Sequence, residues 1–125
     1  MSKWLNRCAL RFPPLRLCVT EKDYLRVCKK LGIKEPLRWI GSTHGASTHF
    51  FTSAKTGMTS CVVTINKKHQ TDDAKIVSRL AHEATHVMQE MLEGIHEKAP
   101  GNEVQAYAVE AITYQLVRSY RRQMK

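Results

Sequence analysis

The sequence has no long hydrophobic run and no recognisable leader. No apolar stretch approaches the roughly 20 residues that a membrane-spanning helix requires. Near the N-terminus, Arg7, Arg11 and Arg16 interrupt every apolar stretch, and no small-residue cleavage site follows. We therefore expect a protein of the cytoplasm that has no membrane partner.

The cysteines lack the spacing of a metal-binding or redox motif, because no two of them form a Cys-x-x-Cys pair. Without a sign of secretion, an even number of cysteines does not indicate disulfides. We expect buried, reduced thiols at all of them, namely Cys8, Cys18, Cys28 and Cys61.

Repeats, low-complexity segments and long linkers are also absent, which predicts a single domain over residues 1–125. A chain of this length buries enough apolar surface to fold without a disulfide or a structural metal. Nothing in the sequence indicates an oligomeric state.

Negative charge is scarce at the two ends of the chain. The net charge is +9, and residues 1–40 hold ten Lys and Arg against three Asp and Glu. Residues 41–100 are balanced at six against six, and residues 101–125 hold four against two. The basic ends fit either a solvated surface or association with nucleic acid. No helix-turn-helix, zinc-finger or RNA-binding signature accompanies them.

The first half of the chain predicts one helix followed by strands. Thr20 is a candidate N-cap for a helix over 21–31, which Gly32 would end. Its inward positions would be Tyr24, Leu25, Val27 and Cys28. Strands are expected over 37–40, 47–53 and 60–66, and the last two are joined by a polar turn that contains Gly57.

The second half predicts two long helices. The first spans about 72–93, with apolar residues at helical spacing, and the second begins at a capping Asn102 and runs to about Tyr120. The order of helix, three strands and two helices predicts an α+β domain. We expect its helices to pack on one face of a small antiparallel sheet.

The first of these long helices contains the sequence His82-Glu83-Ala84-Thr85-His86, which is an H-E-x-x-H motif. At 100° per residue, His82 and His86 lie about 40° apart around the helix and about 6 Å apart along it. Two imidazoles so placed can bind one Zn²⁺. Glu83 projects about 60° to the side of His86, from where it can reach a zinc-bound water.

The run H-E-A-T-H-V-M-Q-E, followed by N-E-V-Q-A-Y-A-V-E-A-I, resembles gluzincin-type zinc metallopeptidases. It is similar in particular to small metallopeptidase-like proteins encoded by bacteriophages and prophages, for which the host cytoplasm would be the location. The resemblance covers about 47–114 and implies a minimal zincin-like domain. It also implies that the strand over 60–66 forms the sheet edge above the zinc, where an extended peptide can bind. The same strand could equally be an ordinary core strand, because its alternation has no strong polar face.

The resemblance implies a third zinc ligand on the last helix. Asn102-Glu103 resembles the Asn-Glu motif of the gluzincins, so Glu103 is the expected ligand and Glu110 is the alternative. We expect Glu103, Tyr107, Glu110 and Tyr114 to share an inward face, since they fall within about 60° of arc. There Tyr107 would donate to the developing oxyanion, and Glu110 could instead orient a ligand histidine.

The sequence thus predicts a zinc-dependent hydrolase that cleaves peptide bonds, with Glu83 as the general base. The alternatives are a non-catalytic binding protein with a zincin fold and a basic module associated with nucleic acid. Four further histidines are expected to be solvated loop residues, namely His44, His49, His69 and His96. His44 and His49 could also line the cleft and donate a hydrogen bond to the transition state.

Overall fold

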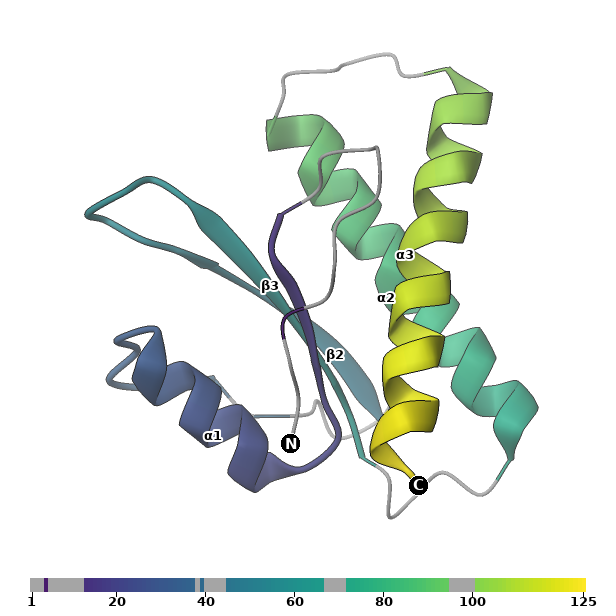
Figure 1. Ribbon diagram of the computed structural model, residues 1–125. Helices are drawn as coiled ribbons and strands as arrows, with labels where there is room; N and C mark the ends of the chain where they lie inside the picture. The colour runs from purple at the N-terminus through teal and green to yellow at the C-terminus, as the bar shows by residue number, and fades with distance from the viewer. Residues whose placement is uncertain (1–3, 5–12, 38, 40–44, 67–71, 95–100) are drawn as a thin grey trace.

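The computed structural model describes residues 4, 13–37, 39, 45–66, 72–94 and 101–125 (Figure 1). Within these residues the chain forms three strands and three helices, which confirms the predicted α+β class. In chain order they are β1 (Leu15–Cys18), α1 (Glu21–Lys30), β2 (Ala46–Thr52), β3 (Thr59–Ile65), α2 (Asp73–Gly94) and α3 (Asn102–Gln123).

The sheet has the strand order β1-β3-β2. β2 and β3 form the predicted antiparallel hairpin, and Gly57 takes a positive φ of 71° in its turn. β1 runs parallel to β3, so the expectation of an antiparallel sheet was wrong for this strand. Of the two roles open to the strand over 60–66, the sheet edge was wrong and the ordinary core strand is confirmed. β3 lies in the centre of the sheet, and β2 is an edge strand among the described residues.

The third strand comes from a different part of the chain than predicted. Neither Leu37 nor Trp39 lies in a strand, and residues 38 and 40 lie outside the described residues. Side chains bind these backbone carbonyls instead. The Tyr24 hydroxyl donates to the carbonyl of Leu37 at 2.8 Å, and Thr64 Oγ1 donates to that of Trp39 at 2.6 Å. Backbone groups that are satisfied in this way need no strand partner.

Side-chain alternation along the strands creates two hydrophobic cores. One core lies between the sheet and α2 with α3, and includes Leu15, Leu17, Val63 and Ile65. The other lies on the opposite face, where Cys18, Val62 and α1 pack together. The helices therefore cover both faces of the sheet rather than one, since β3 is apolar on both sides (Figure 1).

The three cysteines that the structure describes are free and buried, as expected for reduced thiols. They are Cys18, Cys28 and Cys61, and Cys8 lies outside the described residues. Burial raises the pKa of Cys61 to about 12, so this thiol stays protonated and unreactive near neutral pH.

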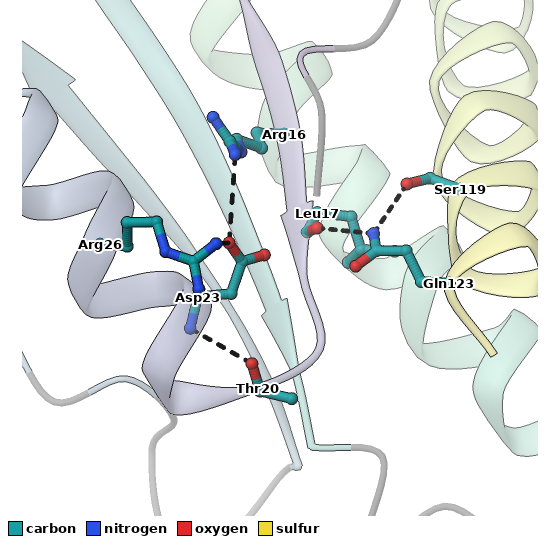
Figure 2. A network of polar contacts seen from close by, with 7 residues as sticks. All are labelled: Arg16, Leu17, Thr20, Asp23, Arg26, Ser119 and Gln123. Carbon is teal, nitrogen blue, oxygen red and sulfur yellow. Dashed lines mark hydrogen bonds and ion pairs between the residues drawn. The ribbon is translucent and has the colours of Figure 1, made fainter. Parts of the chain in front are cut away.

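α1 begins as predicted, because Thr20 Oγ1 accepts a hydrogen bond from the backbone N–H of Asp23. The Asp23 carboxylate is buried and forms ion pairs with Arg16 of β1 at 4.0 Å and with Arg26 of α1 at 3.6 Å (Figure 2). These contacts attach α1 to the first strand. Leu25 is 46% exposed, so its predicted inward orientation was wrong.

α2 and α3 follow the predicted bounds closely, although Gly101 rather than Asn102 is the N-cap of α3. The end of α3 is joined to β1 by Gln123, whose amide donates to the carbonyl of Leu17 at 2.9 Å and to Ser119 Oγ at 3.1 Å (Figure 2). Among the described residues, no helix is long and apolar enough to cross a membrane.

We predict that Asp23→Ala lowers the free energy of unfolding by about 3 kcal/mol, because it leaves the buried Arg16 guanidinium without its carboxylate. Urea denaturation followed by circular dichroism measures this loss. Glu21→Ala is the matched control, since Glu21 is an exposed acidic residue in the first turn of the same helix. We expect the control to lose less than about 1 kcal/mol. Equal losses in the two variants would contradict a structural role for the buried ion pairs.

Candidate metal centre

α2 presents two chemically different surfaces around the H-E-x-x-H motif. Leu80, Ala84 and Val87 are fully buried against the sheet and α3, and Glu83 is buried beside them at 6% exposure. His82 and His86 are exposed. This division follows from the helical period, which turns the two histidines away from the core and leaves Glu83 at its border.

The two histidines converge on one point. Their Nε2 atoms are 3.2 Å apart, and their rings meet edge to face with centroids 4.9 Å apart. One turn of helix brings the rings together, as the spacing predicted. The same separation allows an N–H···N hydrogen bond when only one of the two nitrogens carries a proton.

This separation suits two nitrogens that occupy two coordination positions of one zinc ion. Zn–N bonds of about 2.0–2.1 Å at a tetrahedral angle place two ligand nitrogens about 3.3–3.4 Å apart. The 3.2 Å between the Nε2 atoms is close to that value. Imidazole nitrogen is also a common ligand of zinc in proteins. The donor pair therefore fits the metal that the motif predicts.

Glu83 is directed toward the sheet. Its Oε2 atom accepts a hydrogen bond from the hydroxyl of Thr48, which lies on the edge strand β2. A buried carboxylate needs such a donor, since an unpaired charge is costly away from water. The hydrogen bond connects α2 to β2 at the position of the motif.

Sequence reasoning missed Thr48, although a signal for it was present. In a strand over 46–52, residues 46, 48 and 50 point to the same side. Ala46 and Phe50 are apolar and pack in the core with α2, so the hydroxyl of Thr48 enters the same interface. A hydroxyl on an otherwise apolar face indicates a polar partner across the interface, which here is Glu83.

The structure does not bring the predicted third ligand to the histidine pair. Across the described parts of the chain, no three His, Cys, Asp or Glu residues form a group that could hold a metal ion. Glu103 and Glu110 are both exposed. The C-terminal end of α2 and the N-terminal end of α3 diverge, so the first turn of α3 lies away from α2 (Figure 1). The roles of Glu103 and Glu110 as zinc ligands stay predictions.

The expected inward face of α3 was wrong. Tyr107 and Tyr114 are 60% and 59% exposed, and both glutamates of the same stripe are exposed too. The residues that face the core lie on the opposite side of the helix and include Ala108, Ile112 and Leu116. Apolar side chains took the buried face because burying them is favourable, whereas a carboxylate there would need a partner. The catalytic role of Tyr107 stays a prediction.

Of the remaining histidines, His49 is the one that the structure describes. His44, His69 and His96 lie outside the described residues. His49 is 7% exposed, so the expectation of a solvated loop histidine was wrong for it. It lies on the α1 side of β2, where its ring contacts Tyr24 and Phe51. Thr48 points to the other side of the strand, so His49 is not oriented toward Glu83 as a transition-state donor would be.

Comparison of the chain with protein-family models, with curated proteins and with solved structures finds no match.

Burial of His49 leads to a prediction about pH. Desolvation lowers its pKa below the usual value of 6.5, although the carbonyl of Trp39 and the charge of Glu83 oppose the shift. Between about pH 6.5 and the lower folded-state pKa, the unfolded chain therefore binds more protons than the folded chain. Stability contributed by the neutral ring is present above about pH 6.5 and is lost as the pH falls from there through the folded-state pKa, by at most about 1.4 kcal/mol per pH unit.

His49→Phe is expected to flatten the dependence of unfolding free energy on pH between 7 and 5, because it removes the titrating ring and keeps an aromatic contact. Denaturation in EDTA at several pH values measures this slope. Phe51→Leu is the control, since it alters the same ring stack without removing the histidine. An unchanged slope in His49→Phe would rule out His49 as its source.

Metal content tests the histidine pair. We expect about one zinc per chain in the wild type and a loss of zinc affinity greater than about 100-fold in His82→Ala and in His86→Ala, since a direct ligand contributes more than an outer-shell partner. Elemental analysis and competition with a chromogenic chelator measure both quantities. Gln89→Ala is the control, because Gln89 is exposed on the same helix. Zinc retained in both histidine variants would exclude the site.

The same measurement tests the third ligand. Loss of zinc from Glu103→Ala or from Glu110→Ala would identify the glutamate that binds it.

Proposed function

We propose that the chain is a zinc-dependent hydrolase, a metallopeptidase that cleaves peptide bonds in a protein or peptide substrate of the cytoplasm. The observation that carries the proposal is the convergence of the His82 and His86 Nε2 atoms at 3.2 Å. The buried carboxylate of Glu83 stands next in the chain to His82. A histidine pair open to solvent, on the same helix as a buried carboxylate, offers two of the three ligands of a catalytic zinc and a candidate general base.

Each residue of the motif has a separate task. His82 and His86 would hold the zinc, which supplies a Lewis acid and lowers the pKa of water when it is bound. Glu83 accepts the proton of the attacking water and then passes it to the leaving amine. A general base must come within reach of that proton, and in the proposal the border position of Glu83, between the exposed histidines and the core, lets it serve a water bound beside His82.

Thr48 positions the base. Its hydroxyl donates to Glu83 Oε2, which leaves Oε1 as the oxygen that accepts the proton. The hydrogen bond also restricts rotation of the carboxylate, so the base is oriented before substrate arrives. Thr48 is therefore a positioning residue in the proposal, and it acts only through Glu83.

The edge strand supplies a place for the substrate. Among the described residues, no strand pairs with the outer edge of β2, since the order is β1-β3-β2. An extended peptide can add to such an edge through main-chain hydrogen bonds. Because β2 also carries Thr48, a peptide bound there would lie along the strand that orients the base. In this proposal the peptide binds at β2 and not at β3, which is the central strand.

We predict that Glu83→Gln lowers turnover of a quenched fluorescent peptide library by about 10²–10⁴-fold, because glutamine cannot accept the proton. Zinc content should be unchanged, since Glu83 is not a ligand in this proposal. Thr48→Val keeps the base and removes its hydrogen bond, so we expect a smaller loss of about 10–100-fold. Full activity in Glu83→Gln would disprove the mechanism. Zinc binding by the wild type without hydrolysis of any library peptide would favour the non-catalytic binding protein.

A further inference from the structure

A second candidate site lies along α3. A hollow of about 880 Å³ is lined, among the described residues, only by α3 from Glu110 onward and by Lys125. The lining includes no residue of the H-E-x-x-H motif. Its polar and charged members are Glu110, Tyr114, Arg118, Arg121, Arg122 and Lys125. We call it the α3 hollow.

The charge of the α3 hollow is positive. Among the described residues, four cations and one carboxylate, that of Glu110, line it, which is a surplus of three positive charges. Arg121 is partly neutralised by Asp73 at the start of α2, at 3.4 Å. Arg118, Arg122 and Lys125 form no ion pair with any other described residue. Unpaired cations around one concave surface concentrate an anionic partner there.

An aromatic side chain continues the basic stripe. Tyr114, Arg118 and Arg122 follow each other at intervals of four residues, so they lie on successive turns along one side of α3, about 6 Å apart. All three are exposed, and Tyr114 is 59% exposed. Tyr107, two turns before Tyr114, is 60% exposed on the same side. The core of the protein needs neither ring, since both lie opposite the buried face of α3.

We propose that the α3 hollow binds single-stranded nucleic acid. Phosphates would contact Arg118, Arg122 and Lys125, and a base would stack on the ring of Tyr114. Basic side chains that follow the backbone together with exposed aromatic rings that stack on bases are how proteins bind single strands without sequence preference. A hollow of about 880 Å³ is large enough for a nucleotide, since ligand sites span about 300–1,000 Å³.

Two features favour this partner over others. An acidic peptide would satisfy the cations but would make no use of an exposed tyrosine ring, whereas every base offers a stacking face. In a duplex the bases are already stacked on one another, so a single strand is the form that Tyr114 can bind.

The proposal does not depend on the hydrolase, because the α3 hollow and the histidine pair share no residue.

The test is fluorescence anisotropy with fluorescein-labelled oligo(dT) over a series of NaCl concentrations. For the wild type, we expect the logarithm of the binding constant to fall linearly with the logarithm of the salt concentration. The double variant Arg118→Gln/Arg122→Gln should reduce the magnitude of that slope by about 1.4, since each contact to a single strand contributes about 0.7. Tyr114→Leu should weaken binding by about fivefold or more, and Tyr114→Phe should restore it, because phenylalanine keeps the stacking surface.

The matched control is Lys29→Gln/Lys30→Gln, which removes the same charge from exposed positions at the end of α1, on the other face of the sheet. We expect its slope to stay near that of the wild type. Equal slopes in the two double variants would show that net charge alone attracts the oligonucleotide, and would overturn the proposal. The absence of binding at 50 mM NaCl would overturn it too. If poly-glutamate bound as tightly as oligo(dT) and Tyr114→Leu had no effect, the partner would be an acidic protein and not nucleic acid.

Discussion

Burial of β3 on both faces is the constraint on which the rest of the structure depends. Cys61, Val62, Val63, Thr64 and Ile65 are all fully buried. A strand of this kind needs a neighbour on each edge and a covering layer on each face. β1 and β2 supply the edges, α1 covers one face, and α2 with α3 covers the other.

The candidate metal centre follows from that arrangement. Register with β3 sets Thr48 opposite Val63, and both point toward α2. The hydroxyl of Thr48 is thereby placed where α2 presents Glu83. A shift of β2 by one residue would exchange its two faces and direct His49 to α2 instead. The orientation of the carboxylate therefore depends on strand register as much as on the motif itself.

In the proposed hydrolase, two environments on one helix would serve two kinds of chemistry. A metal ligand must be open to the metal and to substrate, and His82 and His86 are exposed. A general base gains from being held in place, and Glu83 is buried and hydrogen-bonded. The helical period separates these environments by about 60–100° within a five-residue motif. α3 divides in the same way, with an apolar face toward the core and a face of tyrosines and arginines away from it.

The long helices could be predicted well from sequence, because their apolar spacing and end signals are local. The convergence of the two histidines is local too, since one turn of helix is enough to bring their rings together. β1 was missed because its four residues, Leu15–Cys18, follow two prolines and pair with a strand more than 40 residues away. Nothing near β1 in the sequence carries that information.

The sequence by itself determined the α+β class, the two long helices and the spacing that places His82 and His86 together. Only the tertiary structure decided that helices cover both sides of the sheet, that Thr48 is the partner of Glu83, and that Glu103 and Tyr107 lie on the exposed side of α3. The physical reason is the range of the interactions. Helical periodicity acts over a few residues, whereas the choice of buried face and of strand neighbour results from competition among all the apolar surfaces of the chain.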